Sequence, residues 1–167
     1  MRKHSFKVGD SVFYPSAGVG VIEAVEDMFI GGKLDSCYVI RIQENQITVK
    51  VPKSNIGKTG IRPLIDNRKV KELFRVLSGK PARRVTGGNW TERCKELERK
   101  INRGDCMQLG EVVRDLLRWK TQSGLSFEEA MLLETARSYL ARELAIIQGT
   151  SPEAAVESIH HKVGVAA

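Results

Sequence analysis

The chain has 167 residues, of which 41% are hydrophobic and 28% charged, a balance that is typical of globular proteins and excludes disordered and fibrous classes. Its formal net charge of +7 favours an anionic partner, such as nucleic acid or an acidic protein surface. Residues 68–103 hold twelve basic and four acidic residues, so the positive charge is concentrated there and the rest of the chain has a net charge of −1.

Residues 6–62 predict a small β-domain. Apolar and β-branched residues alternate with polar ones in four short segments, and turn-forming residues separate these segments. The segments are 11–14, 19–25, 37–42 and 47–51. Short strands at this spacing, with almost no helix, favour a strongly bent β-barrel of the SH3 or Tudor type. Gly9, Gly18 and Gly20 would serve its tight bends.

The pattern becomes helical after Pro63. Asp66 can cap a short helix, and residues 78–88 are then the best candidate for a linker. Asn89 with Glu92 is close to a capping box at the start of a second helix. The apolar stripes of these helices are Val70, Leu73, Phe74 and Leu77 in the first, and Cys94, Leu97 and Ile101 in the second.

Further helices follow to the end of the chain. Gly104-Asp105 ends one helix and starts the next, Ser126 with Glu129 forms a capping box, and Ser151-Pro152 opens a last helix. The helix after Ser126 is long, and its apolar residues at near-helical spacing are Phe127, Met131, Ala136, Tyr139, Leu140, Leu144 and Ile147. Four or so antiparallel helices with short loops make a compact bundle.

The predicted fold is therefore α+β, with a small bent β-barrel followed by an all-α helical bundle. We expect residues 1–64 to form the β-module, residues 65–88 to hold a short helix and a linker, and residues 89–167 to form the helical domain.

Motifs for catalysis or cofactor binding are incomplete. Gly57-Lys58-Thr59 resembles the end of a P-loop, but Pro52 stands where the upstream glycine is needed. Gly18-Val19-Gly20 could begin a dinucleotide fingerprint, but no βαβ unit follows. His160-His161 has no second ligand cluster nearby, which favours a solvated surface over a metal site. We expect no enzyme activity, no metal and no cofactor.

The three cysteines indicate a reducing compartment. Cys37, Cys94 and Cys106 lack CxxC spacing and cannot all pair. No secretory apolar segment follows Met1, and no apolar run approaches the roughly 18 residues that a membrane span needs. The sequence therefore predicts free thiols in a soluble, cytoplasmic protein.

Nine short segments stand in order along the chain. They are residues 6–10 (Phe-Lys-Val-Gly-Asp), 12–15, 18–20, 38–40 and 51–52 in the first half, and 89–93 (Asn-Trp-Thr-Glu-Arg), 104–105, 111–116 and 124–126 in the second. These segments resemble the CarD/CdnL family of regulators that bind RNA polymerase. The resemblance implies that the β-module is the polymerase-interacting module also found in the transcription-repair coupling factor, and that its sheet edge contacts the polymerase β subunit.

The same resemblance implies a role for the helical domain. In the family this domain lies over the upstream edge of the melted promoter, where a tryptophan enters the minor groove. The expected outcome is a longer-lived open complex at promoters served by the housekeeping σ factor.

Trp90 is the candidate for that tryptophan. It stands at the first turn of a helix, behind Gly87-Gly88, where an aromatic ring could enter an unstacked base step. Alternatively, it packs its helix against the bundle. Arg93, Lys95 and Arg99 would then bind phosphates near it, or they belong to a solvated face with the interspersed glutamates.

Candidates for the polymerase contact lie on three predicted strands. They are Met28, Ile30, Val39, Lys50 and Pro52. In strand-edge addition, backbone pairing supplies affinity and alternate side chains fill pockets. Val39 can equally belong to the core, and some relatives carry arginines where this chain has Met28 and Lys50.

The sequence thus predicts a monomeric, non-catalytic regulator that binds the polymerase β subunit and, weakly, promoter DNA. Residues 81–167 hold 13 basic and 12 acidic residues, which disfavours tight DNA binding without a tether to polymerase. The alternative is a free-standing nucleic-acid binder. The aromatic residues of the β-module that could serve it are few and mostly at core-like positions: Phe13, Tyr14, Phe29 and Tyr38. Trp119, within a helix, is expected to pack or to lie at the surface.

Overall fold

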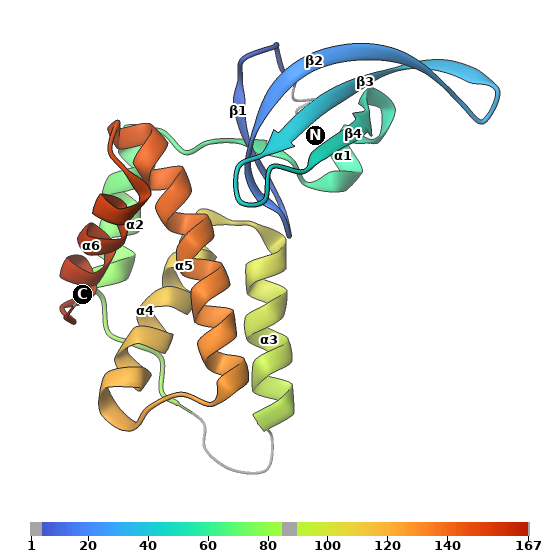
Figure 1. Cartoon of the computed structure of the whole chain (residues 1–167). Coiled ribbons are helices and arrows are strands. Elements are labelled where there is room, and N and C mark those ends of the chain that lie inside the picture. Colours follow the sequence, from blue (N-terminus) through green and yellow to red (C-terminus); the bar gives the residue numbers. More distant parts are fainter. Residues whose placement is uncertain (1–4, 85–89, 167) are drawn as a thin grey trace. The chain divides into compact units, whose positions relative to one another are not determined.

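The structure of the chain is a computed structural model that describes residues 5–84 and 90–166. It divides into two compact units, Met1–Leu64 and Ile65–Ala167. The first unit holds the strands and the second holds the long helices (Figure 1). The second unit therefore includes α2 (Asn67–Ser78). In the sequence analysis, this helix was grouped with the linker, in residues 65–88.

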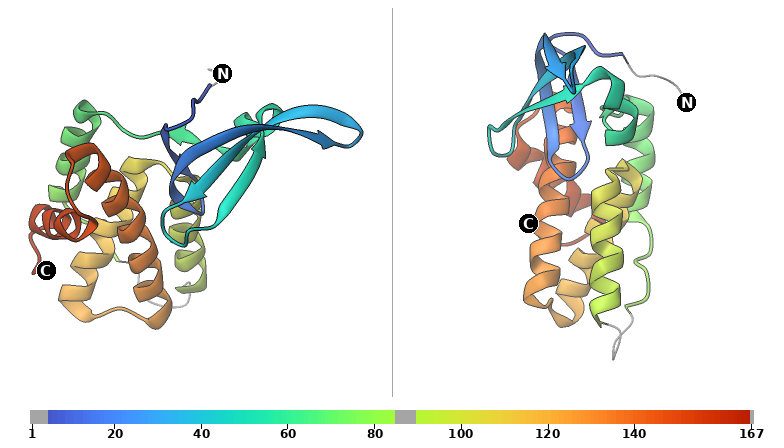
Figure 2. Two further views of the ribbon diagram at one scale, coloured as in Figure 1. Left: turned by 45° about the horizontal axis from the view of Figure 1, so that its top comes forward. Right: turned by 90° about the vertical axis from the view of Figure 1, so that its right-hand side faces the viewer.

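The described residues of the first unit form a five-stranded antiparallel sheet (Figure 2). Its strands are β1 (Ser11–Tyr14), β2 (Gly18–Ile30), β3 (Lys33–Ile42), β4 (Thr48–Pro52) and β5 (Arg62–Pro63), in the order β4-β3-β2-β1-β5. A 3-10 turn, η1 (Lys53–Asn55), and a short helix, α1 (Ile56–Thr59), connect β4 to β5. The two edge strands do not pair with each other, so the sheet is open. The predicted small β-domain is confirmed, whereas its closure into a barrel is not.

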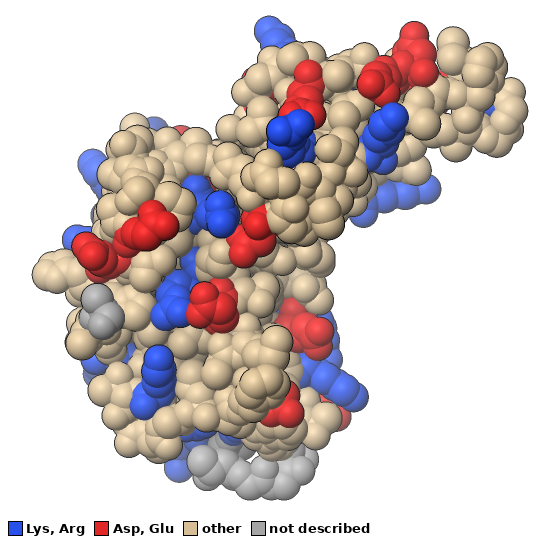
Figure 3. Space-filling view, viewed as in Figure 1, with Lys and Arg blue, Asp and Glu red and all other residues tan. Residues whose placement is uncertain are grey.

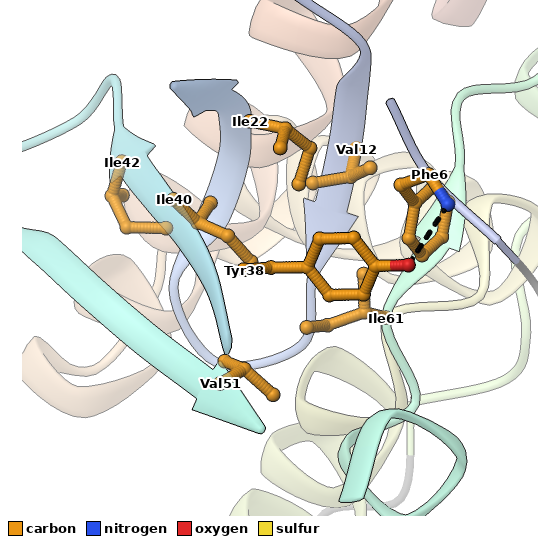
Figure 4. Close-up of a cluster of buried hydrophobic side chains, with 8 residues drawn as sticks. All are labelled: Phe6, Val12, Ile22, Tyr38, Ile40, Ile42, Val51 and Ile61. Atoms are coloured by element: carbon orange, nitrogen blue, oxygen red, sulfur yellow. Dashed lines mark hydrogen bonds between the residues drawn. The ribbon is translucent and has the colours of Figure 1, made fainter. Parts of the chain in front are cut away.

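One face of this sheet carries a core of aliphatic and aromatic side chains (Figure 4). Its buried members are Phe6, Val12, Ile22, Tyr38, Ile40, Ile42, Val51 and Ile61. The ring of Phe6 meets Tyr38 edge-on, with 5.8 Å between centroids, and the Phe6 N–H donates to the Tyr38 hydroxyl at 3.2 Å. Tyr38 therefore helps to fix the segment before β1 to the sheet, together with the backbone hydrogen bonds of Gly9 and Asp10 to Ile22.

The glycines of this unit serve two different purposes. Gly9 and Gly18 have φ of 94° and 100° and lie at bends, as predicted. Gly20 instead lies within β2 at a close approach, since a Cβ there would be 2.7 Å from Cγ2 of Ile40. A glycine inside a strand often marks such a contact.

β2 and β3 continue beyond their neighbours as a two-stranded arm, residues 27–36 (Figure 1). The pairing of β3 with β4 begins only at Cys37, so the arm has no third strand. The Ser36 hydroxyl donates to Asp27 Oδ1 at 2.7 Å across its base. Large apolar side chains near its tip are exposed to solvent, with Phe29 at 79% and Leu34 at 62%.

The described residues of the second unit form five helices packed as a bundle (Figure 1). They are α2, α3 (Trp90–Arg103), α4 (Cys106–Ser123), α5 (Phe127–Gln148) and α6 (Pro152–Val163). α3 packs against α4 and α5, and α2 and α6 pack against each other and against α4. Fully buried side chains fill the interior, among them Leu73, Leu109, Leu116, Leu140, Leu144 and Ile159. The predicted helical bundle is confirmed.

Most predicted helix starts are confirmed by their capping hydrogen bonds. The cap residues Asp66, Asp105, Ser126 and Ser151 accept from the backbone N–H of Lys69, Gln108, Glu129 and Ala154, respectively. Ser126 and Glu129 complete a capping box. The predicted cap at Asn89 lies outside the described residues.

Two predictions for the helical unit are wrong in part, for Phe127 and Met131 of the apolar stripe and for His160 of the histidine pair, whereas His161 is exposed. Phe127 and Met131 are 75% and 57% exposed, because Glu129 occupies the inward position in the first turn of α5 and displaces the apolar stripe. His160 is 7% exposed instead of solvated. Its Nδ1 lies 2.8 Å from the carbonyl oxygen of Ala166, and its Nε2 lies 3.2 Å from Nη1 of Arg137.

Candidate functional site

The described part of the predicted linker is fixed along α4. We call residues 79–84 the strap. The Ala82 N–H donates to Oδ1 of Asp115 at 3.0 Å, and the Ala82 carbonyl accepts from Nε1 of Trp119 at 3.2 Å. Trp119 is 5% exposed and is therefore a packed residue, which was one of its two predicted roles. The strap is therefore a bound segment and not a free linker.

Arg84 ends the strap and joins it to the loop between α4 and α5. Its Nη1 donates to the hydroxyl of Ser123 at 2.6 Å and to the carbonyl of Gly124 at 2.8 Å. Its Nη2 donates to Oε1 of Glu129 at 2.9 Å. The guanidinium carbon also lies 5.6 Å from the centroid of the Trp119 ring, within the range of cation–π attraction.

Glu129 is the shared partner of three segments. Only 1% of it is exposed, and its Oε1 accepts from Arg84 and from the Ser126 N–H, the latter at 3.2 Å. Its Oε2 lies 3.7 Å from Nη2 of Arg93 on α3. Burial acts to raise the pKa of this carboxyl, but the hydrogen bonds of Ser126 and the charge and hydrogen bond of Arg84 outweigh it and hold the pKa below its usual value. The carboxylate therefore stays ionised and links the strap, α3 and α5.

A hollow of about 430 Å³ opens beside this carboxylate. Its lining comes from the strap, the start of α3 and the α4–α5 loop: Arg84, Trp90, Arg93, Ser123, Gly124, Leu125, Ser126 and Glu129. Trp90 is the first residue of α3 and is partly buried. The candidate tryptophan thus borders the hollow, next to two arginines that share one carboxylate.

The predicted phosphate-binding residues divide between two sides of α3. Arg93 follows Trp90 by three residues and its side chain is 15% exposed, so it lies on the face that also buries Leu97 and Ile101. Lys95 and Arg99 are exposed on the other side. The structure brings Arg93 together with Trp90 and separates both from Lys95 and Arg99.

Acidic side chains partner much of the positive charge of α3. Arg99 pairs with Glu96 at 2.6 Å, and Lys100 lies 3.6 Å from Glu111. Figure 3 shows basic and acidic side chains interspersed over one face of the second unit. The α3 part of the basic region found in the sequence therefore carries acidic partners for several of its cations.

Four of the five candidate residues for the polymerase contact fall on the arm and on the edge strand β4, and the fifth, Val39, lies on β3. Met28 and Ile30 belong to the arm, with Ile30 42% exposed. Lys50 is exposed on β4 and pairs with Glu26 at 3.1 Å, and Pro52 is partly buried. Val39 is 7% exposed, which agrees with the alternative prediction that it belongs to the core.

In the sequence analysis, Phe29 and Leu34 were not singled out as exposed residues of the arm. Phe29 was counted among four aromatic residues expected mostly at core-like positions, but it is exposed and pairs across the arm with Leu34. Strand alternation shows which face a residue occupies but not whether a core lies beneath it. The sequence signal that could have indicated the exposure of Phe29 and Leu34 was their position next to the Gly31-Gly32 turn.

The cysteines and possible metal ligands suggest no reactive centre in the described part of the chain. Cys37, Cys94 and Cys106 are not joined in disulfides. Burial raises the pKa of the Cys94 thiol, and the charge of Glu129 raises it further, so the reactive thiolate is disfavoured. Residues 5–84 and 90–166 hold no group of three or more side chains suited to a metal ion. No helix in these ranges has the length and apolarity to cross a membrane.

Comparison with known proteins covers both units. Residues 6–65 match the family model described as the CarD-like/TRCF RID domain, and residues 72–160 match that of the CarD C-terminal domain. The putative transcription factor YdeB of Bacillus subtilis is 34% identical over 144 residues, which span 86% of this chain and 93% of the relative. A solved structure described as CdnLNt from Myxoccoccus xanthus is 39% identical, covers 37% of this chain and 87% of its own, and aligns with a TM-score of 0.32.

Proposed function

We propose, since the chain belongs to the CarD/CdnL family of transcription regulators, that it binds the β subunit of RNA polymerase and stabilises the promoter open complex. The observation that carries this proposal is the match of both units, in order, to the two domains of the family. We further propose that the protein is non-catalytic and monomeric. It would act in the cytoplasm, at the nucleoid, where polymerase holds it near DNA.

The polymerase contact is proposed to use the arm and the β4 edge. An edge strand offers unpaired N–H and C=O groups for strand addition, and Lys50 and Pro52 lie on that edge. The arm adds the exposed side chains of Ile30 and Phe29, which suit an apolar contact. Lys50 keeps the positive charge that some relatives supply by arginine, although Glu26 already pairs with it.

A pull-down of the full chain with the isolated β-subunit lobe tests this contact. Ile30→Glu places a charge on the arm and is expected to reduce binding at least tenfold, the effect of about 1.4 kcal/mol. Val8→Glu is the matched control, because Val8 is 61% exposed in the same unit but lies outside the arm. Equal binding by both variants would place the contact elsewhere.

The DNA contact is proposed to centre on Trp90, with Lys95 and Arg99 binding phosphates from the exposed side of α3. A stacked aromatic is worth about 1–3 kcal/mol per base, so Trp90→Ala should shorten the lifetime of the open complex on the order of tenfold. Binding to polymerase should remain unchanged. Phe127→Ala is the control, because Phe127 is an exposed aromatic of the same unit, at 75%.

The second candidate, a free-standing nucleic-acid binder, makes the opposite prediction. It requires firm binding to free duplex at physiological salt without polymerase. Among the described aromatic residues of the first unit, Phe29 is the one with a largely exposed ring, while Phe13 and Tyr38 are buried, which gives little of a stacking surface. Firm duplex binding combined with no binding to the β lobe would favour this candidate.

A further inference from the structure

We propose that Glu129 is a positioning residue for Trp90, holding the start of α3 through Arg93 and the end of the strap through Arg84. The inference rests on the proposed role of Trp90 in DNA binding. Glu129 touches no DNA in this proposal. It would set where the indole lies when the protein meets the promoter.

The geometry around Trp90 supports this role. The strap ends at Arg84, α3 begins at Trp90, and Arg93 lies one turn further along the same face of α3. Arg84 and Arg93 both approach Glu129, at 2.9 and 3.7 Å. The carboxylate of Glu129 therefore contacts both the end of the strap and the start of α3.

Capping of α5 does not by itself require this arrangement. The capping box uses Oε1 of Glu129 and the Ser126 backbone, and a glutamine at this position could also serve it. The negative charge is needed by the two guanidinium groups, whose side chains are only 18% and 15% exposed. Glu129 therefore neutralises Arg84 and Arg93 in addition to capping α5.

The link to α3 is an ion pair and not a hydrogen bond. Among the buried polar atoms of the described chain, Oε2 of Glu129 and Nε of Arg93 have no hydrogen-bond partner. A charge pair at this distance attracts without fixing direction, whereas hydrogen bonds weaken steeply with poor angles. With the hollow beside it, the start of α3 is held near the strap yet can adjust when the indole enters a groove.

The same pairing gives the proposal a distinctive signature. Glu129 neutralises two arginines that would otherwise attract phosphate. Glu129→Gln should therefore raise the affinity for free duplex and steepen its salt dependence by up to about 0.9 per added phosphate contact. The same variant should shorten the lifetime of the open complex, because Trp90 is misplaced. A variant that merely destabilises the fold would instead lower both the affinity for free duplex and the lifetime of the open complex.

The experiment uses the full chain with RNA polymerase holoenzyme and a promoter fragment. Glu129→Gln is expected to shorten the open-complex lifetime roughly 3- to 10-fold, as coupling energies within one ion-pair network imply. Ser151→Ala is the matched control, because it removes the cap hydrogen bond of another helix of the same unit, α6, lies outside the lining of the hollow and keeps all three charges. Its lifetime should equal that of the wild type.

A double variant tests whether Glu129 acts through Trp90. In the Trp90→Ala background, Glu129→Gln should have no further effect on lifetime. An equal fold-loss in both backgrounds, or a wild-type lifetime for the single variant, would overturn the positioning role. If Trp90→Ala itself leaves the lifetime unchanged, the proposed function of Trp90 fails instead, and the two failures are distinguishable. Should Glu129→Gln not fold, as judged by circular dichroism, Arg84→Gln breaks the strap side of the link and must show the same loss and the same non-additivity.

Discussion

Replacing Asp115 by alanine removes the carboxylate that fixes the strap to α4. Asp115 is 5% exposed. Its Oδ1 accepts from the Ala82 N–H at 3.0 Å and from Nε of Arg114 at 2.9 Å. The substitution therefore takes away one partner of the strap and one partner of a nearly buried cation.

The expected loss of stability comes mainly from Arg114, the cation that loses its carboxylate partner. The Arg114 side chain is 14% exposed, and its other hydrogen bond is to the Val76 carbonyl at 3.2 Å. Removing one partner of a buried ion pair costs about 3–5 kcal/mol. Ala82 is itself exposed, so water can satisfy its N–H once the Asp115 carboxylate is removed. We expect Asp115→Ala to lower the free energy of unfolding of the helical unit by about 3–5 kcal/mol.

Urea unfolding of the full chain, followed by far-UV circular dichroism, measures this change. The helices of 12 residues or more all lie in the second unit, so the helical signal reports that unit. Asp105→Ala is the control, since it removes only the cap of α4 and should cost about 1 kcal/mol. If Asp115→Ala costs no more than this control, the strap is not held by Asp115 and the reasoning is refuted.

Three further predictions concern single contacts. Gly124→Ala should cost about 1–3 kcal/mol, because Gly124 has φ 77° and ψ 171°, a region nearly restricted to glycine. Gly57→Ala, in the short helix α1 with equally open space and no positive φ, should not destabilise, because alanine is favoured over glycine in a helix, and an equal loss of unfolding free energy in both variants would contradict the strain. The folded-state pKa of Glu129 is lowered, so its stabilising contribution is complete above the unfolded-state pKa of about 4.3 and is lost as the pH falls toward the folded-state value. The difference in unfolding free energy between wild type and Glu129→Gln should therefore shrink below about pH 4, and a difference that stays constant would show that no such shift exists. Tyr38→Phe removes the hydroxyl that accepts from the Phe6 N–H and should cost about 1 kcal/mol, measured as faster hydrogen exchange of the sheet amides, whereas unchanged exchange would show that this bond contributes nothing.

Features that depend on neighbouring residues were predictable from the sequence. The helix starts at Asp66, Asp105, Ser126 and Ser151 each need one side chain and a backbone N–H three residues on. The strands and the change from β to α after Pro63 follow from local periodicity. Closure of the sheet was not predictable in this way, because it depends on whether the two edge strands meet.

Features that depend on distant residues were missed. The segment before α3 contains Gly79 and Pro81 and so predicted a linker. Its attachment comes from Asp115 and Trp119, which lie 33 and 37 residues away from Ala82. In the same way, the sequence identified Glu129 as a capping residue, but its pairing with Arg84, 45 residues away, required the fold.

The ion pairs of the helical unit change how its charge bears on DNA binding. Residues 68–103 carry most of the net positive charge, but Arg84 and Arg93 face Glu129 and Arg99 pairs with Glu96. On α3, Arg93, Arg99 and Lys100 all pair with carboxylates, so few cations of this helix remain to displace counterions from phosphates, and each such contact contributes only about 0.9 to the salt slope. A weak, shallowly salt-dependent DNA contact becomes effective only when a tether supplies a high local concentration. The internal neutralisation of α3 is thus a physical reason for the proposed dependence of the DNA contact on polymerase binding by the first unit.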